Sequence, residues 1–332
     1  MTTNSPQAPS FRAGSRTLSL VLDIGSGDVE RRAATGRGEI GGRPQDPVPV
    51  APLSTVSTQR PPRIGWVKLR GWRDLPGAQR SLTVSRKAGR WFVSVLCRIE
   101  AQDPQASTLP AIGIDRGVAT AIATSDGRLL AGPNAYAAAQ DRLAFLQRAL
   151  ARKMKGSSNG RKLKKKIAAL HARVAAVRLD WLHKASTTIA KNHGAVVLED
   201  LRTRAMSESA KGSVKAPGSN VAAKSGINRS ILDQGWGIFR ALLDYKLADR
   251  TLIGALALVN PACTSQTCSC RRHKAADNRL RQDLFSCVAC GHTEHADINA
   301  AKNILRQGMP STPVEGGGCA PGEAGTILEI AA

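Results

Sequence analysis

The sequence lacks a long apolar run. Its longest one, Leu252 to Val259, is far shorter than the roughly 20 residues that a membrane-spanning helix needs. The first residues, Met1 to Pro6, also lack a basic segment followed by an apolar one, so secretion is not expected. These two absences exclude membrane proteins and exported proteins, and we expect a cytoplasmic chain.

Acidic residues are scarce as well. Asp and Glu number 25 against 48 Lys and Arg, which gives a formal net charge of +23. A surplus of this size repels itself unless an anion is bound, and inside a cell the expected anion is nucleic acid. With 332 residues, 42% of them hydrophobic, the chain has room for two or three small domains with a core.

The cysteines are not spread along the chain, which argues against a disulfide scaffold. Five of the seven lie between Cys263 and Cys290, and such clustering in a cytosolic chain is typical of a metal site. Cys287 and Cys290, followed by Gly291, have the spacing of a zinc-knuckle turn, whose thiolates can bind one tetrahedral ion. We therefore expect a structural zinc ion.

The second half of this zinc site departs from the usual spacing. Cys268 and Cys270 have one residue between them, whereas a zinc ribbon usually has two between both pairs. We expect Cys268, Cys270, Cys287 and Cys290 as the ligands, and Cys263 or His273 could substitute for one of them.

Composition and apolar patterning divide the chain into six segments. Residues 61–104 alternate apolar and polar side chains, which predicts a small antiparallel β unit. Residues 135–192 predict a helix pair broken at residues 156–160, because Leu163, Ile167 and Leu170 begin an apolar stripe at helical spacing. The expected segments are 1–60, a disordered leader with one strand-like stretch; 61–104, the β unit; 105–262, an α/β core with the helix pair inserted; 263–295, the zinc ribbon; 296–308, a short helix completing the core; and 309–332, a flexible tail.

Within the core, the strands and helices are predicted in the order hairpin, helix pair, strand, loop, helix, strand. The predicted elements after the hairpin and helix pair are a strand at 195–198, a loop at 203–226, a helix at 230–249, a strand at 252–260 and, after the cysteines, a helix at 297–306.

Three carboxylates stand where a metal site could be built. Asp115 ends the apolar strand that begins at Ile112, Glu199 ends the strand that begins at Val196, and Asp297 follows the cysteine cluster. Hydrolysis of a phosphodiester with two magnesium ions needs several acidic ligands around ions about 4 Å apart. Taken with the charge of +23, the three residues favour a metal-dependent nuclease.

These motifs resemble those of the TnpB (OrfB) family of transposon-encoded, RNA-guided nucleases. The matching stretches are Gly113–Gly117, Val197–Leu201, Thr264–Cys268 with Cys287–Gly291, Asp297–Ala301, and the helix around Asn228–Arg240.

The resemblance implies a fold and an activity. The fold is an α/β, RNase H-like RuvC domain with an inserted zinc ribbon, preceded by a partial β-barrel (wedge-like) unit. The activity is guide-RNA-directed, metal-dependent cleavage of DNA, with a guide RNA made from the transposon end. By motif, Asp115, Glu199 and Asp297 would be the catalytic magnesium ligands, and the four ribbon cysteines would hold zinc.

The chain also departs from the family pattern. Residues 1–60 do not resemble the family's first half of the wedge barrel or its recognition helices. Residues 249–260 lack the Gly-rich turn expected there, and Cys263 stands where the family usually has an aromatic residue. An alternative interpretation is therefore a truncated, cleavage-deficient remnant that still binds RNA or DNA.

A dense basic cluster is the expected nucleic-acid contact, since guide and target are held through their phosphate backbones. Its residues flank the break between the paired helices: Arg152, Lys153, Lys155, Arg161, Lys162, Lys164, Lys165 and Lys166. We expect such a protein to associate with the nucleoid when bound.

Two other classes share part of this pattern. Actin-like and Hsp70-like ATPases have the same core and an Asp-x-Gly after the first strand, but the excess of positive charge, the cysteines and the lack of a later Gly-Gly motif argue against them. A conventional transposase would use the same metal-activated chemistry and would add strand joining, which no residue here demands.

Overall fold

A computed structural model of the chain divides it into two compact units, residues 1–103 with 146–172, and residues 104–145 with 173–332. Each unit is described by itself. None of the helices in the described residues has the length and apolarity that crossing a membrane requires. The structure describes residues 15–25, 56–59, 67–70, 78–100, 105–213, 215–248, 252–253, 255–279, 281–309 and 327–328.

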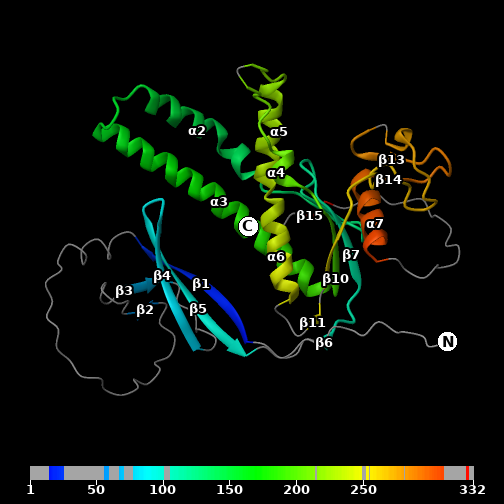
Figure 1. Ribbon diagram of the computed structural model, residues 1–332, viewed down its shortest axis with the longest axis horizontal. Helices are drawn as coiled ribbons and strands as arrows, with labels where there is room; N and C mark the ends of the chain where they lie inside the picture. Colours follow the sequence, from blue (N-terminus) through cyan, green and yellow to red (C-terminus); the bar gives the residue numbers. More distant parts are fainter. Residues whose placement is uncertain are drawn as a thin grey trace. The chain divides into compact units, whose positions relative to one another are not determined.

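The first unit contains a five-stranded antiparallel sheet with the order β2-β3-β1-β5-β4 (Figure 1). Strands β4 and β5 form a hairpin whose turn residues, Ala88 and Gly89, both have positive φ, as a two-residue hairpin turn requires. Val93, Val95 and Cys97 alternate along β5 and are buried. The strands are β1 (Ser15–Gly25), β2 (Val56–Gln59), β3 (Val67–Arg70), β4 (Ala78–Lys87) and β5 (Arg90–Glu100).

The strand-like stretch predicted within residues 1–60 is confirmed as β1, whereas the prediction of a disordered leader is wrong for a second stretch, residues 56–59. Strand β1 pairs with β5 over most of its length, and β2 pairs with β3. Leu18, Leu20, Leu22 and Ile24 alternate with other residues along β1, which is the pattern of a strand with one apolar face. The β unit therefore begins before residue 61. The rest of the leader lies outside the described residues, and a barrel arrangement stays a prediction.

The second unit is built on a mixed sheet with the order β12-β10-β7-β8-β9-β15. β7, β10 and β12 are parallel to one another, and β8 runs antiparallel to β7. The predicted hairpin is present, with Gly127 at φ +94° in its turn. The strands are β7 (Ala111–Asp115), β8 (Ile122–Thr124), β9 (Leu129–Leu130), β10 (Ala195–Glu199), β12 (Ala255–Val259) and β15 (Ile327–Leu328), with a separate short pair, β6 (Gln105–Ala106) and β11 (Leu252–Ile253).

The predicted helix pair is confirmed, with its break at residues 152–157, which include Gly156 but not Gly160. Two other predictions are wrong. Residues 203–226, predicted as a loop, contain α4 and the start of α5. The tail 309–332 contributes β15, which pairs with β9; the rest of the tail beyond residue 309 lies outside the described residues. The helices are α2 (Ala135–Ala151), α3 (Ser158–Asn192), α4 (Thr203–Met206), α5 (Val221–Gln234), α6 (Trp236–Ala248) and α7 (Ala296–Gly308).

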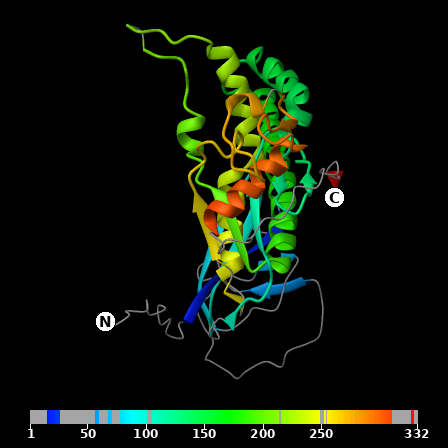
Figure 2. The same cartoon turned by 90° about the vertical axis from the view of Figure 1, so that its right-hand side faces the viewer.

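Helices cover both faces of this sheet. Val196 and Leu198 of β10 face a core shared with Trp181 and Leu182 of α3 and with residues of α6. The residue between them, Val197, faces the other way and packs with α7, which lies across β7 and β10 in Figure 2. The alternation of strand side chains thus separates two cores.

Gly113 allows α7 to approach the sheet closely. A Cβ at this position of β7 would lie 2.2 Å from the carbonyl oxygen of Ala301 and 2.6 Å from the amide nitrogen of Leu305. No side chain fits there, so glycine sets the distance between strand and helix. This contact fixes the first turn of α7, and with it Asp297, near the end of β7.

The cysteine segment folds as a small unit immediately before α7. It contains β13 (Leu284–Ser286), β14 (Thr293–His295) and a 3-10 turn at Ala276–Asn278. β13 and β14 are antiparallel, and β14 runs directly into α7. Phe285 packs with Cys268, Cys287 and Ala296 in a core of its own.

Candidate functional site

The three predicted carboxylates line one cavity in the second unit. Asp115 is the last residue of β7, and Glu199 is the last residue of β10. Because β7 and β10 are parallel neighbours, their carboxyl ends meet at one edge of the sheet. Asp297, in the first turn of α7, completes the group in a cavity of about 290 Å³.

Two of the carboxylates act electrostatically on the third, Asp115. Burial raises the pKa of Asp115 to about 7, and the negative charges of Glu199 and Asp297 add to the rise. Burial also raises the pKa of Glu199, against the opposing effects of a hydrogen bond from Thr264 and the charge of Arg116. Like charges raise each other's pKa only when they are close. A divalent cation among the three would offset this repulsion, so the donor set fits a hard cation with oxygen ligands.

Hydrogen bonds orient two of the three acidic side chains. The Thr264 hydroxyl donates to Oε1 of Glu199 at 2.6 Å. Arg279 Nη2 donates to Oδ1 of Asp297 at 3.3 Å. The backbone amide of Asp297 donates to Nδ1 of His295, the N-cap residue of α7, at 3.2 Å.

Arg116 connects the first two acidic motifs at the base of the cavity. Its side chain is buried, and its guanidinium donates to the backbone carbonyls of Glu199 and of Trp236, the latter at 3.4 Å. Burial lowers its pKa to about 10, against the acidic neighbours Glu199 and Asp115. Arg116 therefore holds β7, β10 and α6 together beneath the carboxylates.

Sequence reasoning did not identify Arg116, Thr264 or Arg279 as site residues. Arg116 and Thr264 lie within the matching motifs, and Arg116 directly follows Asp115, so the motifs carried a usable signal. Arg279 lies in no motif, and only the folded chain brings it to Asp297.

Three of the four predicted zinc ligands come together. The sulfur atoms of Cys268, Cys287 and Cys290 all lie within 4.8 Å of one another, and Sγ of Cys268 is 3.7 Å from Sγ of Cys290. Four sulfurs placed tetrahedrally at about 2.3 Å from zinc would be about 3.8 Å apart. Cys270 is disulfide-bonded and is outside this group, so its role as a ligand stays a prediction.

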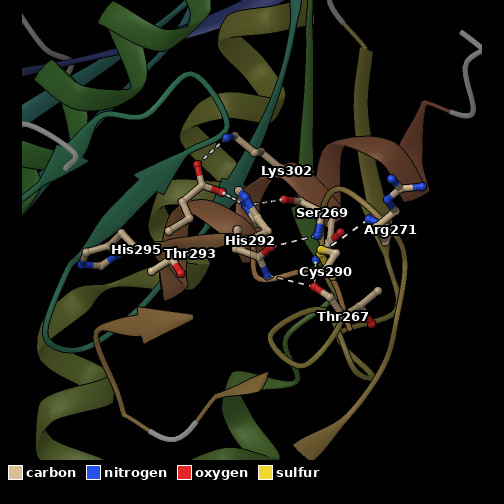
Figure 3. Close-up of polar contacts among 12 residues, drawn as sticks. Thr267, Ser269, Arg271, Cys290, His292, Thr293, His295 and Lys302 are labelled. Carbon is tan, nitrogen blue, oxygen red and sulfur yellow. Dashed lines mark hydrogen bonds and ion pairs between the residues drawn. The ribbon is translucent and has the colours of Figure 1, made fainter. Parts of the chain in front are cut away.

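The cysteine unit is tied to α7 through two asparagines. Asn299 accepts from the amide of Ser269 at 2.9 Å and donates to the carbonyl of Thr267 at 2.9 Å. Asn303 donates to the carbonyl of Thr264 at 2.9 Å. Figure 3 shows this network between Thr267, Ser269 and the helix. Because Thr264 also contacts Glu199, the fold of the cysteine unit bears directly on the carboxylate site.

The predicted nucleic-acid cluster lies in the first unit, at the turn between α2 and α3. All eight of its basic side chains are exposed. No acidic residue occurs between Asp141 and Asp180, so nothing along this stretch of sequence neutralises the charge. The turn can therefore contact a polyanion.

The sequence is similar to known families along most of its length. Residues 94–210 match the OrfB family of the IS605 type, described as "Probable transposase". Residues 236–304 match the "Cas12f1-like, TNB domain" family.

Two relatives have related names. "Putative RNA-guided DNA endonuclease InsQ" of Escherichia coli K12 is 44% identical over 74% of this chain and 61% of its own length. A "Putative RNA-guided DNA endonuclease" of Streptomyces pristinaespiralis is 35% identical over 78% of this chain and 60% of its own length. The chain thus spans about three fifths of the relatives it matches.

Among solved structures, a Cas12f1-sgRNA-target DNA complex resembles the chain with a TM-score of 0.47 at 17% identity. The match covers 72% of this chain and 52% of that one.

Proposed function

The chain belongs to the TnpB (OrfB) family, and from this premise we propose that it is an RNA-guided DNA endonuclease of a transposable element. The observation that carries the proposal is the gathering of Asp115, Glu199 and Asp297 around one cavity. They come from three regions far apart along the chain, and the negative charges of Glu199 and Asp297 disfavour ionisation of Asp115.

The proposed fold of the second unit is an RNase H-like RuvC domain. The strand order β9-β8-β7-β10-β12, with β8 antiparallel to β7 and the last three strands parallel, supports it. In this arrangement the first and fourth strands of the core are neighbours, which places an acid from each at the same edge. The cysteine unit inserted between β12 and α7 would be the zinc ribbon, and the sheet of the first unit would be the wedge-like part.

The proposed reaction is hydrolysis of a DNA phosphodiester. Asp115, Glu199 and Asp297 would hold magnesium, which activates water and stabilises the leaving oxygen. Thr264 would keep Glu199 oriented through its hydrogen bond of 2.6 Å. Arg279 Nη2 is 3.3 Å from Asp297, and this guanidinium could turn toward a phosphate oxygen when Asp297 binds a metal ion instead.

The proposed partners are a guide RNA and a target DNA. The exposed basic cluster of residues 152–166 supports this, since phosphate contacts by Lys and Arg supply most of the affinity that does not depend on sequence. The sequence itself would be read by base pairing between guide and target.

Cleavage of labelled DNA tests the proposal. Purified protein, loaded with RNA transcribed from the element's end, is incubated with a matching target and magnesium. We expect cleavage that is lost in Asp115→Asn and kept in Asp244→Asn, because Asp244 is an exposed residue of α6. Equal activity of both variants would contradict the assigned site. Binding of RNA and DNA without cleavage in the unsubstituted protein would favour the alternative, a cleavage-deficient remnant.

A further inference from the structure

The two halves of the cysteine unit have the same backbone fold, residue by residue. The amide of Cys287 donates to the carbonyl of His292 at 2.9 Å, and that of Gly291 donates to the carbonyl of Cys287 at 2.9 Å. In the first half, the amide of Cys268 donates to the carbonyl of His273 at 3.0 Å, and that of Arg272 to the carbonyl of Cys268 at 2.9 Å.

The amide-to-sulfur contacts repeat in the same way. Cys287 accepts from the amides of the residues two and three positions later, Ala289 and Cys290. Cys268 likewise accepts from the amides two and three positions later, Cys270 and Arg271. The two turns therefore have equal length, and the first is not shortened by one residue as its cysteine spacing indicates.

This correspondence assigns each position of the first turn. Arg272, at φ +60°, matches Gly291, at φ +72°, so an arginine holds the left-handed conformation that favours glycine. Arg271 matches Cys290. Cys270 matches Ala289, the position just before the second ligand.

We propose that Arg271 occupies the fourth ligand position of the ribbon, and that this chain binds zinc through three thiolates only, those of Cys268, Cys287 and Cys290. The Arg271 side chain is exposed, and in Figure 3 it extends away from the sulfur of Cys290. The fourth coordination position is then open to water or a small anion. This resembles the layout of catalytic zinc sites rather than that of closed structural ones.

Neither substitute considered for the fourth ligand joins the group. Cys263 and His273 are not members of the set of ligand atoms within 4.8 Å of one another. His273 is exposed, and its counterpart His292 is buried, with Nε2 3.4 Å from Glu294 Oε2. The proposal therefore stands on the cysteine unit alone and does not depend on the nuclease function.

Metal titration of the purified full chain under reducing conditions tests the proposal. Cobalt(II) is added, and the thiolate-to-metal charge-transfer absorption and the affinity are recorded; zinc then displaces cobalt. We expect one thiolate-bound ion per chain, with the absorption of three thiolates. Cys287→Ser should lose binding, whereas Cys270→Ser should leave both readouts unchanged.

The restoring variant makes the test decisive. Arg271→Cys should add the absorption of a fourth thiolate and raise zinc affinity at least about tenfold, since even residues that only support a ligand change affinity about 10–100-fold. If the single variant folds poorly, the double variant Arg271→Cys with Arg272→Gly replaces it in the same titration, because glycine favours the positive φ of position 272. Loss of a thiolate's absorption in Cys270→Ser, or no gain in either restoring variant, would overturn the proposal.

Discussion

Asp115 is the acidic residue of the site with the clearest rise in pKa. Its pKa of about 7 lies above the ordinary value of 3.8, first because of burial and then because of Glu199 and Asp297. An acid with a raised pKa binds its proton more tightly in the folded state. Its ionisation therefore lowers stability progressively as pH rises from about 4 to 7.

Asp115→Asn should consequently stabilise the protein when no divalent cation is added. Each pKa unit corresponds to about 1.4 kcal/mol, so the gain in free energy of unfolding should reach up to about 4 kcal/mol at pH 8 and be smaller at pH 5. Urea unfolding at both pH values measures it, with the exposed Asp244→Asn as the matched variant. A gain that is the same at both pH values would refute the explanation.

Thr264 is the residue that should tune the affinity of the carboxylate site. Thr264→Val keeps the shape of the side chain but removes the hydroxyl that donates to Glu199. Loss of such a supporting hydrogen bond typically weakens metal binding about 10–100-fold. Calorimetric titration with manganese should show this decrease, while Thr293→Val, at an exposed ribbon position, should bind as the unsubstituted protein does. Unchanged manganese affinity in Thr264→Val would contradict a role of this hydrogen bond in metal binding by Glu199.

At the level of residues, the acidic positions could be predicted because each ends an apolar strand or follows a recognisable motif. Their supporting residues could not. Arg116 donates to the carbonyl of Trp236, 120 positions away in sequence. A contact over such a separation cannot be predicted from the local sequence pattern. The match between Arg271 and a ligand position could not be predicted for a related reason. The spacing of cysteines in the sequence does not show the length of the turn, which the backbone hydrogen bonds define.

At the level of elements, the contact between β7 and α7 decides where Asp297 lies. Gly113→Ala would place a methyl group 2.2 Å from the carbonyl oxygen of Ala301. Overpacking of this kind typically costs about 1–3 kcal/mol, and α7 would have to move. Gly237→Ala is the matched variant, since a Cβ there meets nothing within 4 Å and should stabilise α6 by about 0.5–1 kcal/mol. Urea unfolding of both variants gives the comparison, and equal stabilities would contradict close packing at Gly113.

The helix pair and the sheet strands were predictable because their apolar spacing is regular. The start of α5 was not. Most of this helix is exposed, and its buried residues, Ile231, Asp233 and Gln234, all lie at its end. Residues 221–230 therefore offer no apolar stripe, and the Gly/Ser-rich stretch before them resembles a loop. Strand β1 is strand-like in its sequence, but its partner β5 lies about 75 residues away along the chain, beyond the reach of local pattern.

At the level of the whole molecule, the net charge of +23 should appear as a strong salt dependence of nucleic-acid binding. Replacing Lys164, Lys165 and Lys166 with Gln should lower the slope of log affinity against log salt by about 2–3, because each phosphate that a lysine neutralises contributes roughly 0.7–0.9 to the slope. The matched variant replaces the exposed Lys191, Lys211 and Lys215 with Gln and removes the same charge. Equal slopes for the two variants would show that the net charge of the chain, and not the basic cluster of residues 152–166, determines the salt dependence of binding.

Nuclease activity of this chain requires that three acidic side chains form one metal site. Crystals soaked in manganese, measured at the manganese absorption edge, test this directly through anomalous scattering. We predict an anomalous peak enclosed by the carboxylates of Asp115, Glu199 and Asp297, and no peak there in Asp115→Asn. Saturating manganese without density between these side chains, or with density only elsewhere, would contradict the nuclease assignment.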